Sequence, residues 1–396
     1  MLDTGAGAVE HLYIHVPFCP TICPFCDFHV LERRAGLVEA YLAAIDREAA
    51  ELAATYGVGA LRTVYFGGGT PSYLRDAEIA ALVEIVRRRL GWSTEEATLE
   101  VHPSTAGPGR VAHWAELGFD RLSVGVQSTD DATLRFLGRS HSARDALAAV
   151  HAALDHGGVR VSADLITAVP GQDVEADLER VARLGVGHVS AYTLTIEEGT
   201  PFARAGVEVD AFAEERALAA ADAVLGQHGL ARYEVSNHAR PDERSLHNLA
   251  YWRMRRYLGL GPGATGFYPA LPALGEPAPD ATGVVASGIV ATGAVLGWRR
   301  TNPPLGRWLA GERGEPEVVT ASDYAAETML VGLRLADGVD LTELAQRSGL
   351  DPRVHFAAAL EGEIGVGRLE IEGSTVRATA TGRRVLDQVA SAFLAG

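Results

Sequence analysis

All three cysteines of the chain, Cys19, Cys23 and Cys26, lie within eight residues of one another. Their C-x3-C-x2-C spacing places three thiolates on one short loop directly after a predicted strand. Three thiolates can hold three corners of an iron–sulfur cube and leave one iron without a protein ligand, open for chemistry. Because the 396-residue chain has no other cysteine, a reducing compartment and a metal site fit this usage better than disulfides.

A structural zinc site is the main alternative for this loop. His29 stands three residues after Cys26 and would complete the Cys3His ligand set that closed zinc sites use. Zinc sites usually take their ligands from two loops, and nothing around this segment needs a metal to hold it together. The residues therefore favour the iron–sulfur cluster and leave zinc open.

Several polar side chains stand at or just beyond the ends of other predicted strands: Glu100, Gln127, Arg139 and Asp164. In a parallel sheet these ends share one mouth, where ligands collect. Each residue alone would more often be a solvated rim residue or a salt-bridge partner. The glycine-rich turn at 67–70 also follows a strand and exposes backbone to a ligand, although glycines there could simply form a tight turn.

The composition excludes several classes of function. The net charge is −16, from 51 acidic and 35 basic residues, and this excess repels phosphate backbones and anionic membrane surfaces. Every basic residue is arginine, which excludes a Schiff-base lysine and a Walker-type phosphate loop. The apolar and charged fractions, 47% and 22%, are ordinary for a soluble globular protein.

Two stretches bear on the location of the protein. Residues 1–9 contain neither a basic region nor an apolar run, so no secretory signal is expected and the cytoplasm is the predicted location. The longest apolar run, 283–298, is interrupted by polar residues and is shorter than the ~20 residues that span a bilayer. It is predicted to be a β-hairpin on a loop.

Short β-like runs alternate with helical ones over the first 240 residues. Strands are expected at 11–16, 63–66, 97–101, 121–126, 160–166, 188–194 and 231–235, and the helices between them include 36–56, 77–90, 142–156 and 174–184. Such βα alternation predicts a parallel sheet covered by helices. Seven strands suit an incomplete (β/α) barrel or a doubly wound sheet, and periodicity alone leaves both open.

The alternation stops after residue 240. The Pro/Gly/Ala-rich stretch at 268–304 predicts loops with one hairpin. Helices are then expected at 323–335, 341–348 and 353–364, followed by two wing strands at 368–372 and 375–378 and a last helix from 381. This order resembles a winged helix, but the acidic composition of the segment favours packing or partner docking over DNA. The predicted domains are 1–240, 241–321 and 322–396.

The segment 13–28, which begins with Tyr13 and ends on an aromatic residue, resembles the radical S-adenosylmethionine (SAM) superfamily. In that superfamily a [4Fe-4S] cluster reductively cleaves SAM. Further motifs are similar, in the same order, to those of the oxygen-independent coproporphyrinogen III oxidase-like (HemN-like) family; they stand at 66–71, 100–103, 122–128, 138–139, 163–165, 233–237 and 247–252. Within this family the chain looks most like the HemW-type haem chaperones.

The resemblance implies a fold and a set of binding residues. The fold is a partial (β/α)6 radical SAM barrel, followed by a HemN-like C-terminal domain that ends in a winged-helix-like module. The cluster is expected on the three cysteines. The implied SAM contacts are Tyr13, Phe25, Gly69, Thr70, Pro71, Glu100, Gln127, Arg139 and Asp164. Arg139 is expected to bind a carboxylate through two parallel hydrogen bonds from its guanidinium. Phe25 is expected to lie against the adenine, and Tyr13 to help fix the methionyl end.

Haem, as cargo, is expected at the motif His247-Asn-Leu-Ala-Tyr251-Trp252. Imidazole is a common axial ligand of haem iron, and aromatic rings supply an apolar wall. His247 and Tyr251, four residues apart, share one face of a helical turn. The alternative is that this histidine caps a helix or packs beneath an aromatic pair.

Departures from the oxidase pattern favour the chaperone. The oxidase has a fourth cysteine where this chain has Phe28, and it has a longer arginine-bearing N-terminal arm, whereas twelve residues precede Tyr13 here. Two other positions differ from the common family pattern: Thr265 replaces a histidine, and His102 replaces an asparagine. Because Thr265 stands where family members have the histidine, a haem-pocket role of the family histidine is not carried over to this chain.

The expected function is delivery of haem to haemoprotein acceptors, with the cluster and SAM in an accessory role. The alternative is a radical SAM enzyme, either a coproporphyrinogen III decarboxylase or a radical methyltransferase. The capacity to cleave SAM is expected, whereas coproporphyrinogen oxidase activity is not. The expected partners are haem and haemoproteins, with no nucleic acid, membranes reached only through acceptor proteins, and a homodimer as the candidate oligomer.

Overall fold

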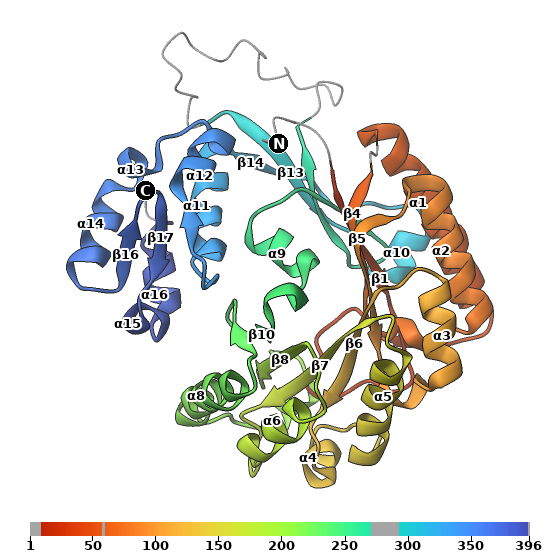
Figure 1. Cartoon of the computed structure of the whole chain (residues 1–396). Helices are drawn as coiled ribbons and strands as arrows, with labels where there is room; N and C mark the ends of the chain where they lie inside the picture. The colour runs from red at the N-terminus through yellow and green to blue at the C-terminus, as the bar shows by residue number, and fades with distance from the viewer. Residues whose placement is uncertain (1–8, 58–59, 271–292, 395–396) are drawn as a thin grey trace.

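The computed structural model describes residues 9–57, 60–270 and 293–394. Its main feature is a curved twelve-stranded sheet (Figure 1). We call the space on its concave side, which contains a cavity, the hollow. At the centre of the sheet, seven neighbouring strands run parallel. In spatial order they are β11 (Tyr257–Leu260), β1 (His11–Val16), β4 (Leu61–Gly68), β5 (Ser93–Val101), β6 (Arg121–Gln127), β7 (Arg160–Thr167) and β8 (His188–Thr193). The sheet does not close on itself, so the predicted partial barrel is confirmed.

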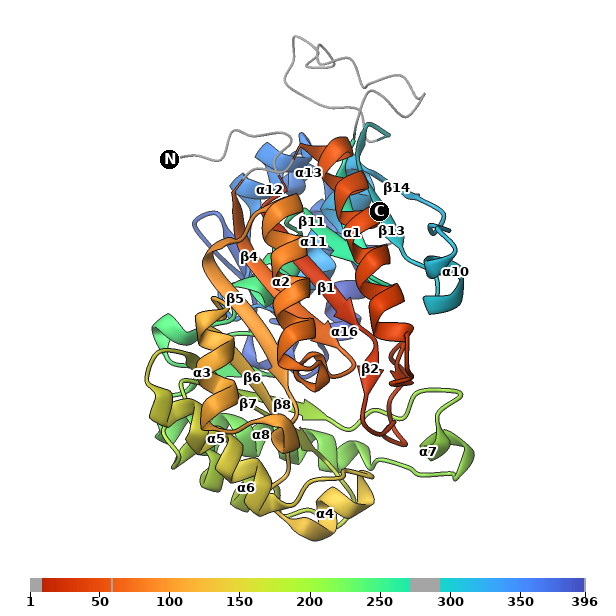
Figure 2. The same ribbon diagram turned by 90° about the vertical axis from the view of Figure 1, so that its right-hand side faces the viewer.

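Helices cover the outer face of the parallel strands (Figure 2). They include α1 (Leu37–Tyr56), α2 (Asp76–Leu90), α3 (Pro108–Glu116), α5 (Ala143–His156), α6 (Val174–Ala182) and α8 (Ala211–Gln227). Local residues set where they begin and end: at the start of α5, Ser142 and Asp145 exchange side-chain-to-backbone hydrogen bonds in a capping box, and Gly157 ends the helix in the left-handed conformation.

Alternation along β6 explains why the hollow is polar. Leu122, Val124 and Val126 are fully buried in the hydrophobic core of the barrel. Arg121, Ser123, Gly125 and Gln127 line the cavity inside the hollow. Because successive side chains of a strand point to opposite faces, one strand contributes both to the core and to the site.

The prediction of a parallel strand at 231–235 was wrong. Only β9 (Ala231–Arg232) forms there, and it pairs antiparallel with β10 (Asn237–Ala239), which itself runs antiparallel to β8. The chain reverses because the Tyr233 amide donates to the Asn237 carbonyl over 3.0 Å. The seventh parallel strand is instead β11, on the other side of β1. With four residues and one glycine, β11 gives little strand signal in the sequence.

The sheet continues into the region after residue 240. β12 (Thr265–Pro269), β13 (Val295–Thr301) and β14 (Glu317–Thr320) extend it as an antiparallel meander beyond β11. The predicted hairpin at 283–298 lies outside the described residues up to position 292, and its described remainder enters β13. Helix α9 (Leu246–Trp252) packs against β4 and β5, between the sheet and the C-terminal end of the chain (Figure 1).

The last residues, 321–394, form a module that we call the C-terminal module. Its helices are α11 (Ala321–Gly332), α12 (Leu341–Ser348), α13 (Pro352–His355), α14 (Ala357–Gly365), α15 (Ala380–Arg383) and α16 (Leu386–Ser391), and its sheet has the order β15 (Val339–Asp340), β17 (Thr375–Ala378), β16 (Leu369–Glu372). The helix expected at 353–364 is two helices, because the backbone leaves the helical conformation at Phe356, whose ring is buried in the core of the module.

None of the helices in the described part of the chain is both long enough and apolar enough to span a membrane.

Candidate functional site

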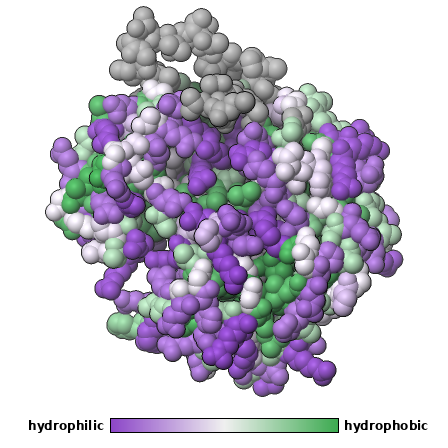
Figure 3. Space-filling model, in the orientation of Figure 1, coloured by the Kyte–Doolittle hydropathy of each residue, from purple (hydrophilic) through white to green (hydrophobic). Residues whose placement is uncertain are grey.

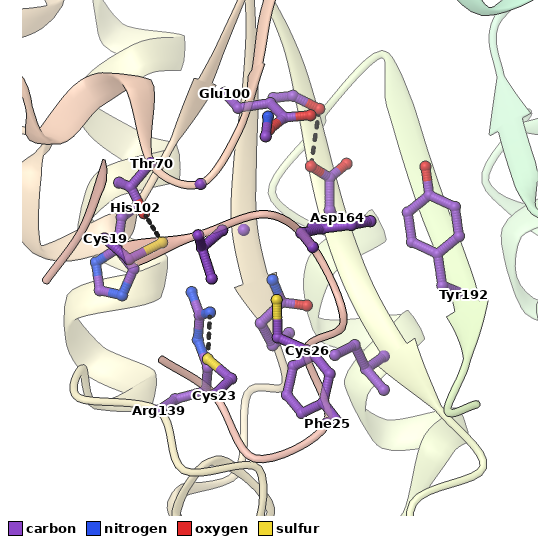
Figure 4. Close-up of a pocket in the computed structure, with 18 of the residues that line it drawn as sticks. Cys19, Cys23, Phe25, Cys26, Thr70, Glu100, His102, Arg139, Asp164 and Tyr192 are labelled. Atoms are coloured by element: carbon purple, nitrogen blue, oxygen red, sulfur yellow. Dashed lines mark hydrogen bonds between the residues drawn. The ribbon is translucent and has the colours of Figure 1, made fainter. Parts of the chain in front are cut away.

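A cavity of about 540 Å³ lies inside the half-barrel, at the ends of β4 to β8 and beneath the cysteine loop (Figure 4). Ten of the residues predicted for the cluster and SAM line it: Cys19, Cys23, Phe25, Cys26, Gly69, Thr70, Glu100, Gln127, Arg139 and Asp164. They come from a loop near residue 20 and from strands spread over the next 150 residues. The structure therefore brings these residues together at one mouth.

Two side chains from the barrel reach the cysteine loop. Thr70 Oγ1 donates a hydrogen bond to Cys19 Sγ over 3.5 Å, and Arg139 Nη1 donates to Cys23 Sγ over 3.3 Å (Figure 4). Burial raises the pKa of the Cys19 thiol to about 11 and raises that of Cys26 as well. Ionising these thiols therefore requires a compensating positive charge, which a bound metal centre provides.

The donor set fits a cluster better than a closed zinc site. His29, the fourth ligand of the zinc alternative, is exposed and does not line the cavity. Its ring lies instead over Gly263, where a side-chain carbon in place of the glycine hydrogen would come within 2.4 Å of it. Within the described residues, no three or more His, Cys, Asp or Glu side chains converge closely enough to hold a single metal ion. Three thiols around one cavity suit a cluster that takes one thiolate on each of three irons.

The glycine-rich turn packs directly against the chain that leads into the cysteine loop. The Gly69 amide donates to the Val16 carbonyl and the Thr70 amide to the Phe18 carbonyl, each over 2.8 Å. A side-chain carbon on Gly69 would stand only 2.9 Å from the Val16 carbonyl oxygen. Glycine is therefore required for this close approach, which places Thr70 beside Cys19.

Glu100 is held in a part-buried hydrogen-bond network at the cavity wall. Tyr65 donates to its Oε1 over 2.8 Å, and the Gly68 amide donates to its Oε2 over 3.1 Å. Burial raises the pKa of Glu100 to about 7, and the two donors act in the opposite direction. The carboxyl group therefore changes its charge near neutral pH.

Asp164 accepts hydrogen bonds from three serine hydroxyls. Ser123 donates to Oδ2 over 2.7 Å, while Ser162 and Ser190 donate to Oδ1 over 2.9 and 2.7 Å. These donors fix the carboxylate against the barrel wall.

Gln127 and Arg139 present polar groups that are available to a ligand. Gln127 has a φ of +65°, in a region that non-glycine residues rarely adopt, at a register shift between β6 and β7. Such strain is found most often at functional sites. The buried Nε of Arg139 has no hydrogen-bond partner among the described residues.

Tyr13 and Pro71 were predicted as SAM contacts, but neither lines the cavity. The Tyr13 hydroxyl lies 3.0 Å from His15 Nδ1, and His15 Nε2 lies 3.0 Å from the His29 carbonyl oxygen. Since that carbonyl only accepts, His15 donates through Nε2, and its Nδ1 accepts a hydrogen bond from the Tyr13 hydroxyl. His15 thus anchors the far arm of the cysteine loop to β1, a role that its position in an ordinary strand did not signal.

His247 and Tyr251 do not line the main cavity. The His247 side chain is fully buried. Its Nδ1 lies 2.7 Å from Thr63 Oγ1 and its Nε2 lies 2.8 Å from the Tyr251 hydroxyl. Both ring nitrogens are therefore occupied, as the packing alternative expected. Trp252 lines a separate cavity of about 200 Å³ against the C-terminal module, whereas Asn248 lines the main cavity.

The mouth of the main cavity has an apolar rim. Phe28 and Ile22 on the cysteine loop are 64% and 45% exposed, and both line the cavity. Phe25 packs against Phe202, with 6.3 Å between ring centroids. Figure 3 shows a mostly hydrophilic face on which hydrophobic side chains are visible within the hollow between the barrel and the C-terminal module.

Two family models match the chain. The Radical SAM superfamily model matches residues 13–185, and the HemN C-terminal domain model matches residues 319–385.

Curated relatives match over most or all of the chain. Heme chaperone HemW of Mycobacterium tuberculosis is 34% identical over 371 residues, which cover 84% of this chain and 94% of that protein. Heme chaperone HemW of Escherichia coli is 31% identical over 399 residues, 97% of this chain and 98% of that protein. The mitochondrial radical S-adenosyl methionine domain-containing protein 1 of Danio rerio is 38% identical over 273 residues. The match spans only about three fifths of the length of such mitochondrial relatives, 61% for this one.

Among solved structures, coproporphyrinogen III oxidase (HemN) from Escherichia coli is similar over 99% of this chain and 91% of that chain, with a TM-score of 0.78. At 21% sequence identity, this likeness concerns the fold.

Proposed function

Because the chain belongs to the HemW family of radical SAM proteins, we propose that it binds haem and delivers it to haemoproteins, and that it carries a [4Fe-4S] cluster and SAM. The observation that carries this proposal is the near full-length likeness to two proteins named Heme chaperone HemW. The cytoplasmic location, the haemoprotein acceptors and a homodimer belong to the same proposal.

In this proposal Cys19, Cys23 and Cys26 hold the cluster. When bound, the cluster supplies an electron and one iron with an open coordination position. Thr70 and Arg139 donate hydrogen bonds to two of the sulfurs. Such donors orient metal ligands and stabilise the thiolate charge.

The residues around the mouth provide complementary groups for SAM. The unpartnered Nε of Arg139 can donate to the methionyl carboxylate, while Glu100 and Asp164 present carboxylates to the amine and the ribose hydroxyls. Phe25 offers an aromatic face for the adenine. The cavity of about 540 Å³ is within the size range of small-molecule sites.

Placement of haem at His247 stays a prediction from the motif. The buried ring would first have to give up its contacts with Thr63 and Tyr251, so binding there requires α9 to shift.

Two experiments on reconstituted protein test the proposal: a haem titration and an assay of coproporphyrinogen III conversion. Haem added under anaerobic conditions should give a shifted Soret band, and absence of the shift would remove the chaperone function. Coproporphyrinogen III supplied with SAM and a reductant should remain unconverted, since Phe28 replaces the fourth cysteine of the oxidase. Formation of protoporphyrinogen IX would assign the chain to the enzyme class instead.

A further inference from the structure

Arg121 is a buried charge whose side chain has no hydrogen-bond or ion-pair partner among the described residues. It begins β6, is only 2% exposed, and lines the main cavity. Within residues 9–57, 60–270 and 293–394, no side-chain hydrogen bond or ion pair within 4 Å involves its guanidinium. A guanidinium has five N–H donors, and a buried charge is normally paired because removing it from water is costly.

Glu96 interacts with Arg121 electrostatically, but its oxygens accept hydrogen bonds from other groups. The amides of Leu246 and His247, at the start of α9, donate to Glu96 over 2.9 Å each, and Arg160 approaches it from outside the cavity at 3.1 Å. Glu96 thus holds α9 against the barrel and leaves the Arg121 donors unused.

Glu100 and Asp164 are two further carboxylates that interact electrostatically with Arg121. Glu100 accepts hydrogen bonds from Tyr65 and Gly68, and the two oxygens of Asp164 accept them from Ser123, Ser162 and Ser190. The barrel therefore provides compensating charge near Arg121 and no direct acceptor for its guanidinium.

Asn248 adds a second free donor to the same cavity. It is on α9, which closes this end of the half-barrel, and it lines the main cavity. Only its backbone amide is engaged, with the Ser245 hydroxyl at 3.3 Å. The described residues contribute no hydrogen bond to its side-chain amide. We call Arg121 and Asn248, with the cavity wall between them, the cavity floor.

We propose that the cavity floor binds a carboxylate group of a ligand, with Arg121 pairing through its fork and Asn248 donating from its amide. A planar guanidinium matches the two oxygens of a carboxylate, and charge-assisted hydrogen bonds of this kind are among the strongest in proteins. The carboxylate supplies the acceptors that Glu96 and Asp164 do not.

Arg121 enters the cavity at the end of β6 opposite the cysteine loop, although two predicted SAM contacts, Glu100 and Asp164, interact with it electrostatically. Arg121 and Gln127 are the first and last residues of β6, so their backbones are about 20 Å apart at roughly 3.3 Å per residue. The cysteine loop, where the SAM amine and carboxylate are proposed to bind, is at the Gln127 end. This separation favours a second ligand as the source of the carboxylate.

Building on the proposed function, we identify this group as a propionate arm of the tetrapyrrole cargo. A propionate arm is short, so an edge of the macrocycle must enter the cavity with it. The methionyl carboxylate of SAM has the same chemistry, and separate measurements distinguish the two sources.

The direct test compares haem with haem dimethyl ester, in which both propionates are blocked. Wild-type protein should bind haem about 10- to 100-fold more tightly than the ester, the range expected for hydrogen bonds to a charged group. Arg121→Met should abolish this preference and Asn248→Ala should reduce it. Arg160→Met is the matched control, because Arg160 forms an ion pair with Glu96 but does not line the main cavity, and it should keep the preference. Equal binding of both compounds by the wild type overturns the proposal.

Thermal unfolding without ligand separates binding from folding. Arg121→Met removes a charge that Glu96 and Asp164 partly compensate, so a loss of melting temperature by itself does not decide the role of Arg121, and the preference for haem over its ester is measured on protein shown to be folded. A lower melting temperature with an unchanged preference for haem over its ester would make Arg121 structural and overturn the proposal. Loss of SAM affinity with the preference intact would assign the carboxylate to SAM and overturn the propionate assignment.

An iron-free probe separates this inference from the haem function. If wild-type protein shows no Soret shift with haem, the proposed function fails. Protoporphyrin IX and its dimethyl ester then test the floor alone, by quenching of tryptophan fluorescence. An Arg121-dependent preference for the free acid supports the site, and its absence overturns it.

Discussion

Arg139 connects the cysteine loop to the barrel mouth through a single hydrogen bond, from its Nη1 to Cys23 Sγ over 3.3 Å. The Nε of the same guanidinium is buried and lacks a partner among the described residues. One side chain therefore contacts a proposed cluster ligand and keeps a donor for the carboxylate of SAM. This geometry makes Arg139 the most direct test of the SAM site.

Arg139→Ala should weaken SAM binding by about 1.5–3 kcal/mol, the range for hydrogen bonds to charged groups, and leave the iron content unchanged. Anaerobic calorimetric titration of reconstituted protein measures the affinity. Arg135→Ala is the matched control, because Arg135 is an exposed arginine of α4 (Asp131–Phe136) and does not line the cavity. Unchanged SAM affinity in Arg139→Ala and also in Asp164→Ala would refute the site.

Replacing Cys19, Cys23 or Cys26 by alanine should remove the cluster and leave the protein folded. Cys23 and Cys26 are half-buried on a loop outside the hydrophobic core, so their loss does not affect the barrel packing. Wild-type protein should reconstitute with about four irons and matching sulfide. Thr21→Ala, on the same loop, should retain them. Stoichiometric zinc without sulfide would contradict the cluster.

SAM affinity should rise with pH between about 6 and 8. Burial raises the pKa of Glu100 to about 7, while Tyr65, Gly68 and Arg121 lower it and Asp164 raises it. Below this pKa the carboxyl is neutral and loses its attraction for the cationic groups of SAM. Titrations across this range should show the rise in the wild type and a flatter profile in Glu100→Gln. A wild-type profile that is flat, or that falls with pH, would contradict an ionised Glu100 in the site.

The same pKa sets the sign of the pH dependence of stability. The pKa of Glu100 is raised above its ordinary value of 4.5, so its protonated form favours folding below that value, and this contribution is lost as the pH rises through 7. Glu100→Gln should therefore be less sensitive to pH between 5 and 8 in urea unfolding. An equal pH dependence in both proteins would show that Glu100 ionises normally.

The strand-end rule predicted most of the mouth because it needs only local information. Glu100, Gln127 and Asp164 follow from the position of each strand end, and the parallel topology brings them together. Arg121 could not be found in this way, because it stands at the opposite end of β6 and enters the hollow only through the alternation of side chains along that strand. Arg121 is a candidate ligand-binding residue because its guanidinium has no hydrogen-bond or ion-pair partner among the described residues. That property depends on where Glu96 and Asp164 lie in the fold, which the sequence does not give.

Roles predicted from sequence motifs were less reliable for side chains whose hydrogen-bond partners lie elsewhere in the chain. Tyr13 was expected to touch SAM, but its hydroxyl is used by His15. His247 was expected to face a ligand, yet Thr63, 184 residues earlier in the chain, holds its ring inward. Sequence spacing gives the face of a helix but does not say which distant side chain meets that face.

The hydrogen bond between His247 and Tyr251 gives a test of the predicted haem ligand. The bond, 2.8 Å from Nε2 to the hydroxyl, keeps the ring in the core, so a haem at His247 binds only when the bond breaks. Tyr251→Phe removes the hydroxyl and keeps the aromatic ring. If His247 is the axial ligand, this variant should bind haem up to about tenfold more tightly, since a typical hydrogen bond contributes about 0.5–1.5 kcal/mol and the fraction of binding-competent protein rises. His247→Ala should lose the Soret shift while it keeps its iron and its SAM affinity. A retained Soret shift in a folded His247→Ala protein, together with unchanged haem affinity in Tyr251→Phe, would show that His247 only braces α9.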